Sequence, residues 1–269
     1  SIKPHLDMAA PIMKSVPESA GGKQVLEHCS GRIEMDNVTF RYAEGAPAVL
    51  DDLSLKIRPG QSVGVVGKTG CGKSTLMRLL LGFEKPQKGA VLYDGRDIET
   101  LDVASLRRNI GTVLQDGKLF TGDIFSNIVV AAPWLTMEDA WEAAELAGIA
   151  DDIRAMPMGM NTMVSEGAGG ISGGQRQRIL IARAVAPKPK VLFFDEATSA
   201  LDNVTQRQVS EALDRMKCTR IIVAHRLSTI RACDRIIVLD GGRVVEDGTY
   251  EELCALGGVF AELVERQTM

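Results

Sequence analysis

The chain of 269 residues is long enough for one large domain or two closely joined subdomains, and 45% hydrophobic and 25% charged residues are typical of a globular protein. A formal net charge of −4 argues against a surface that binds duplex nucleic acid or anionic lipid. The sequence shows no apolar run of membrane-spanning length and no secretory signal pattern. Five scattered cysteines without metal-ligand spacing indicate a reducing compartment rather than a disulfide framework.

The first 30 residues contain three prolines and a Gly-Gly pair, which break any long element. We therefore expect a linker over residues 1–30 and the folded domain over residues 31–269. A helix is expected to start inside the sequence 67–74 and to end at Gly82. Alternating or apolar runs predict the first strands over residues 33–42, 49–57, 62–67, 90–95 and 110–115, the third of them buried on both faces.

A helical subdomain is predicted over about residues 116–187, because most of this stretch is rich in Ala, Met and other helix formers. Within it, Thr136 is expected to cap a helix together with Asp139. The alternation of strands and helices predicts an α/β core with a mainly parallel sheet. The later predicted elements are strands over 191–196, 220–225 and 235–240, a hairpin partner over 243–248 that turns through residues 240–242, and a single closing helix over 250–265.

The sequence GKTGCGKS at residues 67–74, called the phosphate loop below, fits the pattern G-x-x-x-x-G-K-[ST] between a buried strand and a helix. Its glycines allow the backbone N–H groups to turn inward, and the helix N-terminus adds partial positive charge, so the loop is expected to bind nucleotide phosphates. Lys73 is expected to reach the β- and γ-phosphates and Ser74 to ligate Mg²⁺. A glycine-rich turn before an ordinary helix is the alternative. The predicted nucleotide-binding residues here are Gly67, Lys68, Thr69, Gly70, Cys71, Gly72, Lys73, Ser74 and Thr75.

Two acids end the predicted strand VLFFDE at 191–196, after four apolar residues. Ligands of open α/β sheets bind at the carboxyl ends of the strands. Asp195 is therefore expected to hold Mg²⁺, directly or through water, and Glu196 to polarise the water that attacks ATP. The alternative is a solvated turn, which the presence of a phosphate loop disfavours.

A second glycine-containing loop, ISGGQ at 171–175, opens another predicted helix and offers bare backbone N–H groups to an anion. ISGGQ resembles the LSGGQ signature of ABC ATPases, and VLFFDEATSALD follows it as in that family. The resemblance covers almost all of residues 32–266, and Ile171 for the usual Leu conserves volume. It implies a P-loop NTPase core with a mainly parallel sheet, an N-terminal antiparallel β subdomain and an inserted α-helical subdomain.

The resemblance also implies the remaining roles in ATP binding and hydrolysis. Tyr42 would stack on adenine, Gln115 would touch Mg²⁺ and sense the transmembrane partner, and His225 would contact the γ-phosphate. Taken singly, each could be an ordinary structural residue, but the ordered set of motifs favours the functional interpretation. Two chains would form a head-to-tail homodimer, in which the signature residues Ser172, Gly173, Gly174 and Gln175 of one chain would contact the ATP bound to the other. Residues 199–202 would form a loop that crosses the interface between the two chains. The implied catalytic residues are Lys73, Gln115, Glu196 and His225, and the implied Mg²⁺ ligands are Ser74, Gln115 and Asp195.

Residues 114–128, and residues 164–170 with Glu166, resemble the exporter form of the family. This implies the nucleotide-binding part of an exporter at the cytoplasmic face of the bacterial inner membrane. The transmembrane domain would precede it in the same polypeptide, with residues 1–30 as the linker, or the chain would be a separate subunit. Residues 203–206, 226–236 and 248–267 resemble bacteriocin or peptide exporters, whose substrate would contact the membrane domain rather than this chain. The alternatives are an importer ATPase subunit, a non-transport ABC ATPase, and a module that binds nucleotide without hydrolysing it.

Overall fold

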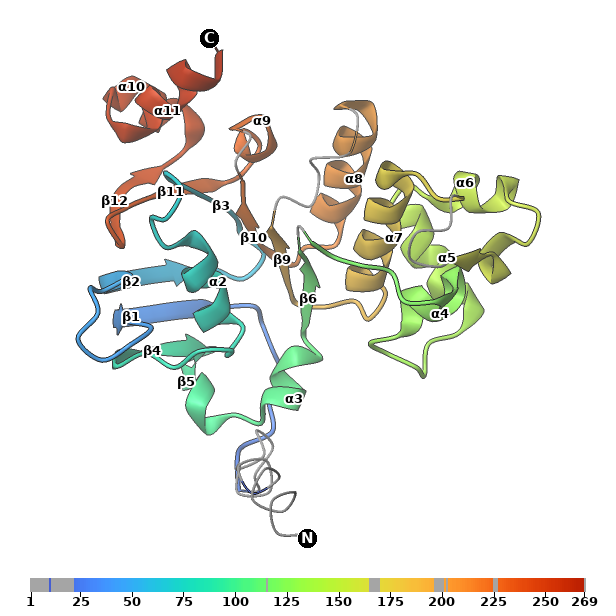
Figure 1. The fold of residues 1–269 in the computed structure, drawn as a ribbon, viewed down its shortest axis with the longest axis horizontal. Helices are drawn as coiled ribbons and strands as arrows, with labels where there is room; N and C mark the ends of the chain where they lie inside the picture. Colours follow the sequence, from blue (N-terminus) through green and yellow to red (C-terminus); the bar gives the residue numbers. More distant parts are fainter. Residues whose placement is uncertain are drawn as a thin grey trace, which may run out of the picture.

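The computed structural model describes residue 10 and residues 22–114, 116–164, 170–195, 201, 203–224 and 227–268. This part of the chain contains a four-stranded sheet, a six-stranded sheet, a two-stranded sheet and a group of helices. Figure 1 shows the helices α4 to α7 on the right and the two larger sheets to their left. Among the described residues, no helix is both long enough and apolar enough to cross a membrane. The predicted α/β class, with its antiparallel and mainly parallel sheets, is confirmed.

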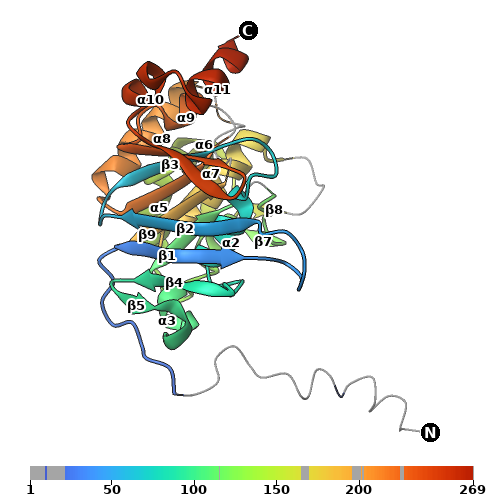
Figure 2. The same ribbon diagram turned by 90° about the vertical axis from the view of Figure 1, so that its left-hand side faces the viewer.

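The first sheet is antiparallel and has the strand order β2-β1-β4-β5. Its strands alternate buried apolar and exposed polar residues, most clearly in β2, as a sheet with one face on a core requires. Figure 2 shows this sheet below the parallel sheet, with the C-terminal helices at the other end of the molecule. The strands are β1 (Ile33–Phe40), β2 (Leu50–Ile57), β4 (Lys88–Tyr93) and β5 (Arg96–Asp97).

The second sheet has the order β12-β11-β3-β10-β9-β6, and its neighbours are parallel except for β12. All five residues of β3 are buried, which confirms the strand expected to be covered on both faces. The predicted hairpin is also confirmed, because β11 pairs antiparallel with β12 through a Gly241-Gly242 turn with φ of 54° and 77°. The strands are β3 (Ser62–Val66), β6 (Ile110–Val113), β9 (Val191–Asp195), β10 (Thr219–Val223), β11 (Arg235–Asp240) and β12 (Arg243–Gly248).

Within the predicted helical range lie α4 (Ile124–Val129), α5 (Met137–Leu146), α6 (Ala150–Ala155) and α7 (Gly173–Val185). The capping box of Thr136 and Asp139 is present at the start of α5, as expected. No individual helix was predicted at α4, and the short ladder of β7 (Gly122–Asp123) with β8 (Met163–Val164) was not predicted either. The remaining helices are α2 (Lys73–Leu80), α3 (Val103–Arg107), α8 (Asn203–Arg215), α9 (Leu227–Ile230), α10 (Tyr250–Leu256) and α11 (Val259–Thr268), with short 3₁₀ turns at Ile98–Thr100 and Gly159–Asn161.

The prediction of one closing helix is wrong, because the chain forms α10 and α11 instead. Gly257 adopts a φ of 68° at the end of α10, a left-handed conformation that stops a helix. Glu246 then accepts hydrogen bonds from the backbone N–H groups of Val259 and Phe260, at 2.5 and 2.9 Å, and so caps the start of α11. The apolar spacing that predicted one helix continues across the break and hides it.

Strand β9 separates two hydrophobic cores. Val191 and Phe193 belong to the core that contains α2 and the antiparallel sheet. Leu192 and Phe194 belong to the core that contains the apolar face of α7. Successive side chains of a strand point to opposite faces, so α2 and α7 pack on opposite faces of the parallel sheet.

The last part of the predicted linker packs on the domain. Gln24 exchanges backbone hydrogen bonds with Thr100 and Asp102, at 2.9 and 2.7 Å. Leu26 and Cys29 are buried, and burial raises the pKa of the Cys29 thiol. Residues 24–29 are therefore anchored to the fold at the antiparallel sheet and the segment before α3.

Candidate nucleotide-binding site

Four neighbouring parallel strands end at one edge of the sheet, in the order β3, β10, β9 and β6. The phosphate loop follows β3, and Asp195 is the last residue of β9, with only β10 between these strands. Gln115, Glu196 and His225 lie outside the described residues, but each follows β6, β9 or β10 within two positions of the chain. The topology thus brings together, at the carboxyl edge where open α/β sheets bind ligands, the ends of the strands that these predicted residues follow.

At two glycines of the phosphate loop, a side chain would clash with neighbouring atoms. Gly67 has a φ of 152°, and a Cβ there would lie 2.2 Å from the carbonyl oxygen of Leu239. Gly72 has a φ of 108° at the start of α2, and a Cβ there would lie 2.7 Å from Leu50 Cδ2. Side chains at either position would push the loop away from the strands around it.

The side chain of Lys73 lies inside the turn formed by the phosphate loop. It is only 6% exposed, and its Nζ donates hydrogen bonds to the carbonyl oxygens of Gly67 at 2.7 Å and Lys68 at 3.1 Å. The loop therefore holds a positive charge at the N-terminus of α2, where the helix dipole also favours an anion. Ser74 is exposed on the same turn, while Thr75 is buried.

Tyr42 lies beside the first turn of α2, because its hydroxyl is 3.0 Å from Thr75 Oγ1. Its ring lies nearly perpendicular to that of Phe40, with the ring centroids 4.9 Å apart, and the residue is 57% exposed. An exposed aromatic ring next to a phosphate loop is suited to stack on a base.

The signature loop, residues 171–175, begins α7 with a capping box. Ser172 Oγ accepts a hydrogen bond from the Gln175 N–H at 3.1 Å, and Gln175 Oε1 accepts one from the Ser172 N–H at 2.9 Å. Gly173 is exposed, and apart from its chain neighbours and the backbone of its own helix no atom lies within 4 Å of where a Cβ would be. The first turn of α7 therefore offers backbone N–H groups to a molecule that approaches from outside.

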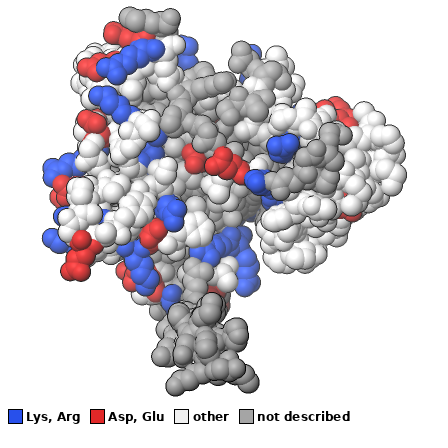
Figure 3. Space-filling view, viewed as in Figure 1, with Lys and Arg blue, Asp and Glu red and all other residues white. Residues whose placement is uncertain are grey.

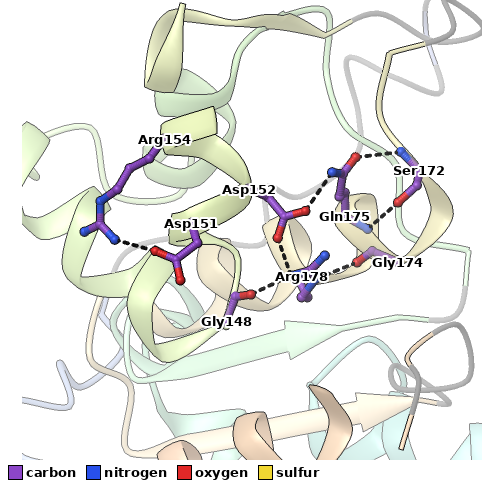
Figure 4. A network of polar contacts seen from close by, with 8 residues as sticks. All are labelled: Gly148, Asp151, Asp152, Arg154, Ser172, Gly174, Gln175 and Arg178. Carbon is purple, nitrogen blue, oxygen red and sulfur yellow. Dashed lines mark hydrogen bonds and ion pairs between the residues drawn. The ribbon is translucent and has the colours of Figure 1, made fainter. Parts of the chain in front are cut away.

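Sequence reasoning did not find two residues that hold the signature loop. Figure 4 shows Gln175 pointing at Asp152 of α6, which also binds Arg178 of α7. Arg178 follows the signature by three positions, but Asp152 lies 26 positions before Arg178 and has no local signal. Only the packing of α6 against α7 brings them together.

The described part of the chain contains no group of three or more His, Cys, Asp or Glu side chains that could hold a metal ion. The predicted Mg²⁺ ligands include an exposed hydroxyl, Ser74, and one carboxylate, Asp195, both at the carboxyl edge. Oxygen donors of this kind suit Mg²⁺, which usually keeps several waters and shares its coordination with the phosphates of a nucleotide. The residues therefore fit a metal ion that arrives with its nucleotide.

Comparison with known proteins supports these motifs as a set. The family model described as ABC transporter matches residues 50–199, which include the phosphate loop and the signature loop. The chain belongs to the ABC transporter family. It is an ATP-binding and ATP-hydrolysing member, and the predicted family and enzyme class are confirmed.

Relatives in this family are considerably longer. The cyclolysin secretion/processing ATP-binding protein CyaB of Bordetella pertussis strain Tohama I is 47% identical over 256 residues, which are 94% of this chain and 36% of that protein. The alpha-hemolysin translocation ATP-binding protein HlyB of Escherichia coli O157:H7 is 46% identical over 244 residues, 90% of this chain and 35% of that protein. The chain thus spans about a third of the length of these relatives.

A solved structure shows the same fold. The structure of a bacterial Atm1-family ABC exporter with ATP bound aligns with a TM-score of 0.91 and 36% identity, over all of this chain and 47% of that chain. The agreement extends over both sheets and the helical part, since the whole chain is covered.

Alkylation of Cys71 is expected to block ATP binding. Its thiol is inside the phosphate loop, 5% exposed, and 3.8 Å from Lys73 Nζ, so an added group would occupy the space that phosphates need. Bound ATP should protect the thiol, which mass spectrometry of maleimide-labelled protein can measure. The half-buried Cys254 is the internal control, since ATP should not change its labelling. Labelled Cys71 in protein that still binds ATP would contradict this prediction.

Proposed function

We propose that the chain is the motor of an ABC exporter and that two copies close head to tail around two ATP molecules. One observation carries this proposal: α2 and α7 pack on opposite faces of the parallel sheet, in different cores. Because the two anion-binding loops open helices of different cores, we infer that one chain does not enclose an ATP molecule between them and that a second chain is needed. Each ATP would then lie between the phosphate loop of one chain and the signature loop of the other.

In this proposal, Lys73 and the phosphate loop hold the β- and γ-phosphates, and Tyr42 stacks on the adenine. Ser74, Gln115 and Asp195 would hold Mg²⁺, directly or through water, and the ion would neutralise charge on the phosphates. Glu196 orients and deprotonates the attacking water, and His225 contacts the γ-phosphate. The burial of Lys73 in the loop and the position of Asp195 at the edge of β9 support these assignments.

We further propose that a transmembrane domain docks on the helical part of the chain, which places the chain at the cytoplasmic face of the inner membrane. Figure 3 shows few charged side chains over the lobe of α4, α5 and α6, in contrast to the mixed charges over the sheets. Large apolar side chains are exposed on and beside these helices, between 45 and 69%. They are Phe120, Val130, Trp134, Met158 and Met163. The remaining length of the relatives leaves room for such a domain.

The exported substrate is proposed to be a polypeptide that contacts the membrane domain rather than this chain. Relatives at 45 to 47% identity are named for the secretion or translocation of cyclolysin, alpha-hemolysin and leukotoxin. These names favour a protein toxin over the bacteriocin expected from the sequence. They also favour export over the importer and non-transport alternatives.

Mixing two inactive variants tests the head-to-tail arrangement. Lys73→Met inactivates the phosphate loop, and Gly174→Asp places a carboxylate in the signature loop, so neither homodimer has an intact composite site. A mixed dimer has one intact site, formed by the normal phosphate loop of the second variant and the normal signature loop of the first. Phosphate release by the mixture is therefore expected to exceed that of either variant alone at equal total concentration.

The control is a mixture of Lys73→Met with a chain that carries both substitutions, which can form no intact site. If the first mixture is no more active than this control, the two loops do not combine between chains and the proposal is wrong.

A further inference from the structure

An acid lies beside the loop that is proposed to meet a triphosphate, which is an unexpected place for negative charge. Asp152 Oδ1 accepts a hydrogen bond from Gln175 Nε2 at 2.8 Å, and Asp152 Oδ2 binds Arg178 at 2.7 Å (Figure 4). The side chains of Arg178 and Asp152 are 15% and 31% exposed. Both oxygens of one half-buried carboxylate are thus used to hold two residues of α7.

Arg178 neutralises this acid and joins three segments. It donates to the carbonyl oxygen of Gly148 between α5 and α6 at 2.5 Å, and its Nε lies 3.4 Å from the carbonyl oxygen of Gly174 in the signature loop. The ion pair with Asp152 leaves little net charge next to the anion-binding turn.

Burial opposes ionisation of Asp152, but hydrogen bonds from Gln175 and Arg178, with the charge of Arg178, outweigh it and lower its pKa. The carboxylate is therefore charged, and so an acceptor at both oxygens, at neutral pH.

The side chain of Gln175 has both of its ends fixed by this arrangement. Its oxygen accepts from the Ser172 N–H, and its amide nitrogen donates to Asp152. With the nitrogen held by α6, the capping box at the start of α7 has one conformation, and the first-turn N–H groups keep their direction. A preset turn loses less entropy when it binds a ligand than a turn that must be ordered first.

We infer that Asp152 is a positioning residue for the signature loop, which it sets, through Gln175, to receive the nucleotide held by a second chain. This inference rests on the proposed function, because it assumes that the start of α7 meets the ATP of the partner. Asp152 touches neither ATP nor the attacking water in this assignment, and it acts only through α7.

Asparagine is the sharpest replacement for Asp152. It has the same shape, but one of its two terminal atoms becomes an NH₂ donor, which must face either the amide nitrogen of Gln175 or the guanidinium of Arg178. Because both of these are donors, one hydrogen bond is lost whichever way the amide is turned. Asp151→Asn is the matched control, since Asp151 is the preceding residue, its side chain is 98% exposed, and it pairs with Arg154 at the surface.

The experiment measures ATP-driven dimerisation by analytical ultracentrifugation with Mg·ATP in excess, in a Glu196→Gln background that slows turnover. Asp152→Asn is expected to raise the protein concentration at half-dimerisation about tenfold, the effect of losing one charge-assisted hydrogen bond. Asp151→Asn is expected to change it by less than about twofold. Binding of a fluorescent ATP analogue to dilute monomer and the melting temperature show whether Asp152→Asn damages the phosphate loop or the fold.

Combination with Gln175→Met separates positioning from general stabilisation. If Asp152 acts through Gln175, adding Asp152→Asn to Gln175→Met weakens dimerisation little further, whereas a merely structural effect adds in full. Full additivity, or an Asp152→Asn protein that dimerises like the parent, would overturn the inference. A parent that stays monomeric with ATP would overturn the proposed function, and the inference with it.

Discussion

Methionine in place of Lys73 is expected to weaken ATP binding about a hundredfold, because the loop loses the charge and hydrogen bonds that Lys73 gives to the phosphates. Lys73 is buried, and its Nζ donates hydrogen bonds to two carbonyl oxygens of the loop and to the Cys71 thiol. Carbonyl oxygens and a thiol are neutral and do not balance the charge of a buried ammonium, whereas the phosphates of a nucleotide do. Isothermal titration calorimetry with Mg·ATP measures the change in affinity.

The matched control is Arg78→Met on the same helix. Arg78 is exposed and pairs with Glu84 at 3.1 Å, outside the phosphate loop, so its loss should leave ATP affinity within about twofold of wild type. Equal ATP affinity in the Lys73 variant and the wild type would show that the phosphate loop does not bind the nucleotide through this lysine.

Glutamine in place of Glu196 is expected to slow ATP hydrolysis about 10²- to 10⁴-fold, the usual contribution of a general base. ATP binding should persist, since glutamine has the same shape and the phosphate loop is unchanged. ATP then stays enclosed between two chains, so the variant should elute as a dimer in size-exclusion chromatography with ATP and as a monomer without it. Phosphate release under the same conditions measures turnover.

Glu211→Gln on the exposed face of α8 is the control for a charge change without loss of the base, and it should hydrolyse ATP like the wild type. A Glu196→Gln protein that is monomeric at saturating ATP, or that turns over at the wild-type rate, would refute the role of Glu196.

The strands of the parallel sheet could be predicted because each is a short apolar run with a clear boundary, as β3 and β9 show. The cap of α5 could be predicted because Thr136 and Asp139 are neighbours in sequence and act locally. The β7–β8 ladder could not, since it pairs residues 122 and 164 over two positions only, and no local pattern encodes that contact. The break at Gly257 was hidden by apolar spacing that continues through it.

The candidate site also contains parts that could be predicted from the sequence and parts that could not. The phosphate loop and the signature loop are contiguous sequences whose chemistry depends on their own backbone, so sequence alone identifies them. The Asp152 contact depends on how α6 packs on α7, and an aspartate in a polar helical turn has no distinguishing mark in the sequence. Local motifs thus identify the groups proposed to meet the ligand, whereas the groups that hold these motifs in place can be found only from the fold.

The position of β9 between two hydrophobic cores affects how the domain unfolds. Its residues alternate between the two cores, with Val191 and Phe193 in one and Leu192 and Phe194 in the other, and it is paired on both sides with β6 and β10. Neither core can open without exposing one face of this strand to water. The parts of the domain built around these two cores are therefore expected to unfold as one cooperative unit. Heat or denaturant that unfolds the core around α7 should therefore also unfold β9, the strand that ends in Asp195. Enzymatic activity should then be lost together with the first loss of structure.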